Sequence, residues 1–329
     1  MVYSINLEVA LKKYLSFLLM YFTIPIYVAY LHKHHGSFFW KTLFTFIVGM
    51  LTIGLVLGLA VPEIGILAGG RFKGILGNPN GLGIFLNLTF ILWLVIREFK
   101  LTNFTEKEDK FILFVLLASL FWCGSRNGLM SVFMFYMVYR MVKIHWSLAI
   151  MMVVAVIVFE DLIFISFIEL IQFFQLGNYF RLDSLEEGSG RQVAWVFAWV
   201  EIQKYFFIGG GFGHDENIFR PNYYWLERLG HNGGVHSSYL SLWFDSGLIG
   251  LLLYFGGMIT NIVKSFKFSY IGVAFFVSIC FNITYESWLI GSLNPFTIIF
   301  LIILTIFVEG LKGEELTSTE LLKENDDEY

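Results

Sequence analysis

Long apolar runs recur along the whole chain and set the strongest limit on what it can fold into. Of the 329 residues, 57% are hydrophobic, only 15% are charged, and 37 are phenylalanine. Soluble domains are nearer half apolar and one quarter charged, and an apolar run of about 18 residues is long enough to cross a bilayer as a helix. The sequence therefore predicts a protein built from membrane-spanning helices.

The apolar runs predict an all-α fold, a polytopic membrane helix bundle of about nine spans with one long, partly helical extracytoplasmic loop. The pair within 111–142 could instead form a re-entrant hairpin. The expected regions are N-terminal transmembrane helices (1–160), the long loop (161–246), C-terminal transmembrane helices (247–310) and an acidic cytoplasmic tail (311–329). The expected spans are 14–31, 38–60, 81–96, 111–123, 128–142, 145–160, 247–263, 268–287 and 294–310.

The short connections between these spans differ in positive charge, and that difference predicts the orientation. Cytoplasmic loops of membrane proteins carry an excess of Lys and Arg. The long loop and the N-terminus belong to the alternate, less positive set, so we expect both outside. The residues that mark the cytoplasmic set are Lys33, Lys41, Arg97, Lys100, Lys107, Lys110, Arg140, Lys143, Lys264, Lys267 and Lys312.

The long loop is rich in aromatic residues, which disordered segments lack. Within it, residues 191–207 place apolar side chains at helical spacing. This pattern predicts an amphipathic helix that lies against the membrane or folds over a cavity.

His236 opens a segment, His236–Gly250, with the signature of a helix that enters the membrane. Ser237 and Ser238 are favourable N-cap residues, and His236 would lie at the positive end of that helix, which favours neutral imidazole. A neutral imidazole at the membrane surface is suited to act as a general base. The alternative is an interfacial histidine that only caps the helix.

Arg191 and Gln192 follow two glycines directly before the amphipathic helix. Glycine leaves backbone N–H groups free to bind an anion, the helix start adds a favourable dipole, and Arg191 adds a permanent charge. Together they predict a site for phosphate or diphosphate, and the alternative is a turn with a solvated arginine.

Three further polar residues lie near the same predicted surface. Arg71 precedes a turn-rich entry into a span, and Arg126 lies between two apolar runs, where an arginine is costly unless it meets a cavity or a partner. Headgroup contact by a snorkelling side chain is the alternative for both. Glu286, near the outer end of a span, could orient His236, contact a sugar or cap a helix.

Several other classes of site lack support in the sequence. No basic arm predicts nucleic-acid binding. The histidines at 32, 34 and 35 have no partnering ligands, and His214 is followed by an acidic pair without the spacing of a zinc protease, so we predict no metal and no cofactor. No Asp-x-Asp sequence occurs, which argues against a metal-dependent glycosyltransferase that uses nucleotide sugars.

The motifs together resemble the O-antigen ligase and O-antigen polymerase superfamily of bacterial envelopes. In that family the long periplasmic loop ends in His, then Asn, Ser or Gln, nine residues and Gly-x-x-Gly. His236-Ser237, nine residues and Gly247-Leu248-Ile249-Gly250 match it fully, whereas His231-Asn232 does not. Gly188–Arg191 resembles the family's entry to the loop helix. The segments 77–80 and 124–126 resemble its upstream loop motifs.

The resemblance implies a multi-pass protein of the bacterial inner (cytoplasmic) membrane whose active loop is periplasmic. Its function would be metal-independent, inverting transfer of a glycan from undecaprenyl diphosphate to an acceptor hydroxyl. The acceptor would be a glycolipid or a second lipid-linked glycan, and membrane lipids would surround the enzyme. Arg191 and His236 would be catalytic. Arg71, Arg126, Gln192 and Glu286 would bind the diphosphate or glycan.

Two other functions are compatible with the composition. A transporter or flippase for a lipid-linked glycan would place charges in mid-span and break helices in paired halves, which the sequence does not show. An inactive, truncated family member is the second alternative. The family usually has three more spans before the long loop, so we expect helices to be missing at the N-terminal side.

Overall fold

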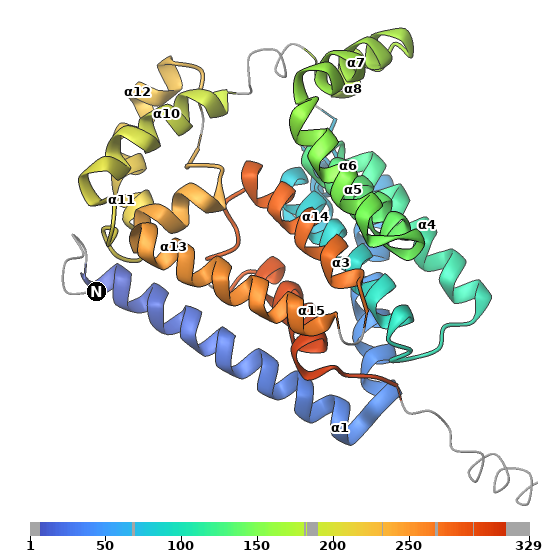
Figure 1. Cartoon of the computed structure of the whole chain (residues 1–329). Helices are drawn as coiled ribbons and strands as arrows, with labels where there is room; N and C mark the ends of the chain where they lie inside the picture. The colour runs from blue at the N-terminus through green and yellow to red at the C-terminus, as the bar shows by residue number, and fades with distance from the viewer. Residues whose placement is uncertain are drawn as a thin grey trace, which may run out of the picture.

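The computed structural model describes residues 7–67, 70–180, 182, 190–231, 233–266, 269–291 and 293–313. Within these ranges the chain is helical, and its one extended pairing is an isolated antiparallel bridge between Ile66 and Phe72. The prediction of an all-α helical bundle is confirmed (Figure 1).

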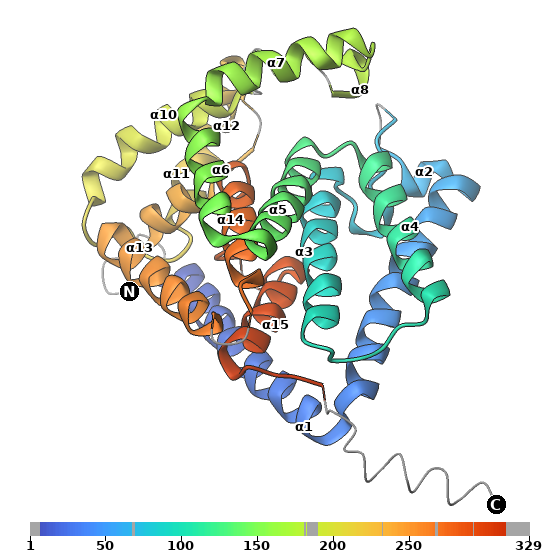
Figure 2. The same ribbon diagram turned by 45° about the vertical axis from the view of Figure 1, so that its right-hand side comes forward.

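The first helix, α1 (Leu7–Ala60), covers two of the predicted spans and bends between them. Gly36 has φ 48° and ψ −128°, a conformation outside the helical region that glycine adopts at little cost. At 1.5 Å per residue, 54 residues would extend about 80 Å, far more than the roughly 30 Å of a bilayer core. Figures 1 and 2 show the two halves of α1 meeting at this bend, so the chain reverses where the sequence predicted a loop.

The remaining helices form two sets on either side of the long loop. The first set is α2 (Pro62–Gly65), η1 (Gly74–Leu76), α3 (Pro79–Glu98), α4 (Glu106–Cys123), α5 (Arg126–Ile144), α6 (Trp146–Val158), α7 (Glu160–Phe173) and α8 (Gly177–Phe180). The second is α10 (Arg191–Ile202), η3 (Gln203–Tyr205), α11 (His214–Phe219), η4 (Arg220–Asn222), α12 (Tyr223–Arg228), α13 (Ser238–Ser265), α14 (Ile271–Tyr285) and α15 (Pro295–Glu309).

Three of the described helices, α1, α3 and α13, are both long and apolar enough to cross a membrane. Two more, α14 and α15, are apolar but shorter. Each predicted span overlaps a helix, but the number of nine crossings stays a prediction.

The bundle is centred on α3, which is buried for most of its length among α4, α5, α14 and α15. Where α3 crosses α5, Gly83 meets Gly128 with no side chain between the two backbones. A Cβ added at Gly128 would lie 2.8 Å from both the Cα and the carbonyl oxygen of Gly83. Small residues allow this close helix packing, which membrane helices use widely.

Gly128→Ala should therefore destabilise the bundle by about 1–3 kcal/mol, because neither backbone can move away from the new methyl group. A lower melting temperature of the detergent-purified protein would show the effect. Gly256→Ala is the matched control, since a Cβ there meets nothing within 4 Å. Alanine at that helical position should be neutral or slightly stabilising, and equal losses in both variants would contradict the crossing argument.

The helices of the long loop form a small unit with its own apolar cluster, built around Ala198, Phe219 and Leu226. This unit contacts the N-terminal end of α1, where Lys13 Nζ lies 2.6 Å from Glu216 Oε1. The long loop and the beginning of α1 are therefore at the same end of the bundle, in agreement with the prediction that both lie on one side of the membrane. Which side that is stays a prediction.

Candidate functional site at the end of α14

The candidate site is centred on Glu286, the residue that follows α14. Its Oε1 accepts a hydrogen bond from Arg191 Nη2 at 2.9 Å, across 95 positions of sequence. The two side chains are only 10% and 20% exposed, so the pair is largely removed from water. The Arg191 guanidinium also lies 5.8 Å from the centre of the Tyr285 ring, within the range of a cation–π contact.

Burial raises the pKa of the Glu286 carboxyl group, and two arginines oppose that effect. The larger opposing contribution comes from Arg191, and a smaller one comes from Arg71. Burial disfavours a lone carboxylate, whereas a nearby positive charge stabilises it. Arg71 therefore acts on the same carboxyl group as Arg191, although it belongs to a different loop.

Arg71 is fixed by the loop that ends α4 and by the first turn of α3. Its Nη2 donates to Asn80 Oδ1 at 2.9 Å, and its Nε donates to the carbonyl oxygen of Cys123 at 3.2 Å. Gly124 then adopts the left-handed conformation, with φ 56°, which turns the chain sharply into α5. The short loop predicted at 124–127 is thus the surface on which Arg71 rests.

Arg126 is the first residue of α5 and is half-buried. The next residue, Asn127, donates through Nδ2 to the carbonyl oxygen of Asn282 at 3.0 Å, one turn before the end of α14. Asn282 is itself held by Ser131, whose Oγ lies 3.0 Å from its Nδ2. This hydrogen bonding ties the Arg126 turn to the segment that presents Glu286.

His236 comes to the same place because the residues after it dock on the chain beyond α14. Ser237 N donates to Ser287 Oγ at 2.8 Å, and Ser238 N donates to the Glu286 carbonyl oxygen at 3.1 Å. His236 itself has φ 48°, a left-handed conformation that is uncommon for a residue with a side chain and carries local strain. Such strain persists only where the surroundings hold it.

The serines after His236 act differently from the sequence expectation. Ser237 occupies the N-cap position of α13, but its side chain makes no capping hydrogen bond. The Ser238 hydroxyl instead donates to the Glu286 carbonyl oxygen at 2.7 Å and accepts from Trp288 N at 3.1 Å. The hydroxyl group therefore joins two segments of the site, and a cap motif read from local sequence could not reveal that contact.

His231, which the spacing test set aside, lies directly beside His236. Their ring centres are 5.6 Å apart in an edge-to-face arrangement, and His231 is almost fully buried. Its Nε2 donates to the carbonyl oxygen of Gly234 at 2.9 Å and closes the turn that precedes His236. The signal in the sequence was only that two histidines flank a pair of glycines.

The beginning of α10 packs against this same turn. A Cβ added at Gly190 would lie 2.2 Å from the carbonyl oxygen of Gly230 and 3.0 Å from His231 Cα. The contact explains the glycine before Arg191, and it places the Arg191 helix start next to the His236 turn. Gln192 is exposed on the first turn of α10.

Five of the six residues singled out in the sequence thus belong to one neighbourhood. Three cationic side chains and one histidine come from four separate segments and meet around the end of α14. No set of three or more His, Cys, Asp or Glu side chains in the described ranges is arranged to hold a metal ion. A site of this composition can bind a multiply charged anion and accept a proton beside it.

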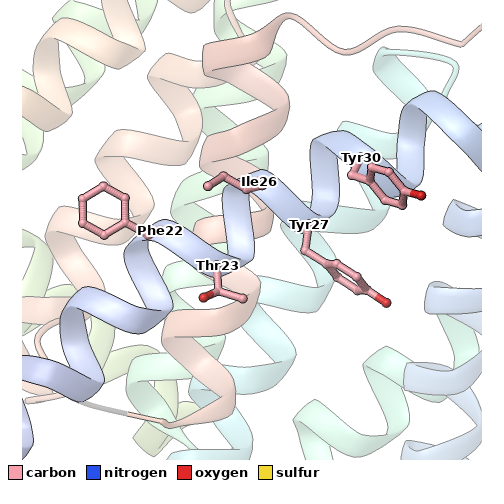
Figure 3. A pocket seen from close by; sticks show the side chains of 5 residues that line it. All are labelled: Phe22, Thr23, Ile26, Tyr27 and Tyr30. Atoms are coloured by element: carbon pink, nitrogen blue, oxygen red, sulfur yellow. The ribbon is translucent and has the colours of Figure 1, made fainter.

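A hollow on the outer surface of α1 is a different kind of feature. It is lined by Phe22, Thr23, Ile26, Tyr27 and Tyr30, which project outward from the helix in Figure 3. It is open and apolar, and it contains none of the site residues. Its chemistry suits contact with lipid better than catalysis.

The apolar helices and the cationic site define the class, a membrane protein with an anion-binding centre at one end of its bundle. Residues 111–255 match the family model described as O-antigen ligase. The resemblance to the O-antigen ligase and polymerase superfamily is thereby confirmed, and this part of the chain belongs to it. The match includes Arg126, Arg191 and His236, whereas Arg71 and Glu286 lie outside it. No curated protein and no solved structure shows a significant match.

Proposed function

We propose that the chain is a membrane glycosyltransferase that moves a glycan from undecaprenyl diphosphate to an acceptor hydroxyl at the periplasmic face. Membership of residues 111–255 in the O-antigen ligase family supports the general class. The observation that carries the proposal is the buried Arg191–Glu286 pair, which lies next to the turn that bears His236. The pair supplies an arginine for the leaving group, and the turn supplies a base for the acceptor.

The arginines would bind the diphosphate of the donor. Cleavage of the bond between the sugar and the diphosphate adds negative charge to the departing oxygen, and a guanidinium beside it stabilises that charge. Arg191 presents a planar group with paired donors, which suits phosphate oxygens. Arg71 and Arg126 would add charge from the opposite side of the end of α14. In this mechanism three arginines supply the charge that a metal ion would otherwise provide.

His236 would act as the general base. As the acceptor oxygen forms its bond to the anomeric carbon, the bond from that carbon to the diphosphate oxygen breaks and its electron pair leaves with the diphosphate. The hydroxyl proton passes to the imidazole nitrogen of His236. A single displacement of this kind inverts the configuration at the anomeric carbon. The strained backbone of His236 keeps the ring in one place for this step.

Glu286 would hold Arg191 in position before the donor arrives. A bound diphosphate competes with the carboxylate for the guanidinium, so part of the binding energy is used to rearrange the pair. Because burial already raises the pKa of Glu286, the carboxyl group can take up a proton when the arginine turns to the donor.

Complementation tests the proposed function directly. The full chain is expressed in a cell that accumulates an undecaprenyl-diphosphate-linked glycan because its own ligase or polymerase has been deleted. We expect the lipid-linked intermediate to fall and surface polysaccharide to appear. Glycan attached to a glycolipid indicates a ligase, and a ladder of repeat units indicates a polymerase.

His236→Ala at wild-type abundance should fail in the same assay. If it restores polysaccharide as well as the wild type, transfer with His236 as base is wrong. A flippase should complement a deletion of the flippase rather than of the ligase or polymerase. That result would replace the proposal with transport.

A further inference from the structure

Helix α10 has two apolar faces, and only one is covered by protein. Ala194, Ala198 and Ile202 are buried in the apolar cluster of the loop unit. On the opposite side Val196, Trp199 and Val200 are exposed by 67%, 46% and 56%. We call these three residues the α10 outer face. A helix with a large apolar surface outside the bundle core needs an apolar surrounding.

The chain after α10 continues this exposed surface through the turn Phe206–Ile208. Phe207 is 62% exposed and Ile208 is 70% exposed. The turn is nevertheless held firmly, because Leu248 N donates to the Phe206 carbonyl oxygen at 2.8 Å and Ile249 N donates to the Phe207 carbonyl oxygen at 3.2 Å. Its two large side chains therefore point outward from a fixed backbone.

The attachment point is the bend of α13, where the long apolar part of that helix begins. Gly247 has φ 70° and ψ −177°, and a Cβ there would lie 2.3 Å from the Phe207 backbone. Beyond the bend Leu252 and Leu253 are 62% and 72% exposed on a helix long and apolar enough to cross a membrane. Figures 1 and 2 both show the end of α10 beside the first turns of α13.

The exposed apolar surface is therefore continuous from the spanning part of α13 through the turn to the α10 outer face. We propose that Phe206–Ile208 and the α10 outer face are seated in the lipid surface around the start of α13, so that the membrane itself holds one side of the loop unit. The occupant is the boundary between headgroups and acyl chains.

Charge points to an apolar attachment rather than to recognition of anionic lipid. Lys204, the cation nearest this surface in sequence, lies 2.7 Å from Glu201 Oε2 in an ion pair. Burial of the exposed apolar area then supplies the free energy, at roughly 25 cal/mol per Å². The proposal does not depend on the transfer reaction.

Depth-dependent fluorescence quenching tests this placement. Single cysteines replace Phe207, Val200 or Tyr224 in a full-length chain whose Cys123 and Cys280 are changed to alanine. Each is labelled with a small environment-sensitive dye, and the protein is placed in phosphatidylcholine nanodiscs. Tyr224 is the control, because it is 83% exposed on α12, on the side of the loop unit away from the bend of α13.

We expect lipids with a spin label near the headgroup to quench dyes at 207 and 200 several-fold more than dye at 224. Aqueous iodide should show the opposite order, and addition of anionic lipid should change neither. Iodide quenching at 207 as strong as at 224 would overturn the proposal. So would shielding at 207 from both quenchers, which would indicate that a second copy of the chain covers this surface.

Discussion

Arg191→Ala is expected to lower glycan transfer by about 100- to 1,000-fold, the usual cost of removing a group that stabilises charge on a leaving oxygen. Arg191→Lys should fall between the two, because it keeps the charge but loses the planar pair of donors. Consumption of the lipid-linked glycan in membranes with matched protein abundance measures the loss. Lower activity without a change in abundance would assign the effect to the reaction.

Glu286 provides the control that separates chemistry from folding. Arg191→Ala leaves a buried carboxyl group without its partner, which costs up to about 3–5 kcal/mol unless the group takes up a proton. Since burial already raises the pKa of Glu286, we expect proton uptake to limit that cost. Adding Glu286→Gln should restore the melting temperature of Arg191→Ala but not its transfer activity. Recovery of both would mean that Arg191 serves only the fold.

The ion pair also predicts a pH effect with a definite sign. As pH falls through the raised pKa of Glu286, its carboxylate is protonated and the pair with Arg191 is lost at a higher pH than for an ordinary glutamate. The wild type should then approach the behaviour of Glu286→Gln at low pH, whereas Glu286→Gln should lack this step.

Sequence patterns predicted those parts of the molecule that depend on local order. Apolar runs at helical length gave helices at the expected places, because a spanning helix satisfies its own backbone hydrogen bonds. The spacing from His236 to Gly250 identified the family, and Gly247 is the point where α13 bends. The glycine before Arg191 was interpreted as part of an anion site, and the structure adds that it permits contact with Gly230.

The remaining features depend on contacts between distant segments, which no local pattern encodes. Glu286 was expected to orient His236, to contact a sugar or to cap a helix, and in the structure it binds Arg191. Ser238 was expected to cap α13, but it bonds to the chain after α14. His231 failed a spacing test that concerns one motif only, and its burial beside His236 follows from the folded loop. Tertiary hydrogen bonds here override local preferences.

Gly233→Ala is expected to remove most of the transfer activity without touching any charged group. A Cβ at this position would lie 2.6 Å from His236 Nε2, far closer than such atoms approach in proteins. The imidazole must move, and a base displaced by about 1 Å can lose of the order of 100-fold in rate. We therefore expect Gly233→Ala to approach His236→Ala in the same transfer assay.

Two neighbouring glycines separate this collision from the other consequences of adding a methyl group. Gly230 has φ +83° but open space around its Cβ position, so Gly230→Ala reports backbone strain alone. Gly234 has open space and no left-handed strain, so Gly234→Ala reports the substitution itself. Gly234→Ala should match the wild type, and Gly230→Ala should lose stability but retain most transfer per folded molecule. Equal loss of transfer in Gly230→Ala and Gly233→Ala would show that turn conformation, rather than the position of the His236 ring, controls the reaction.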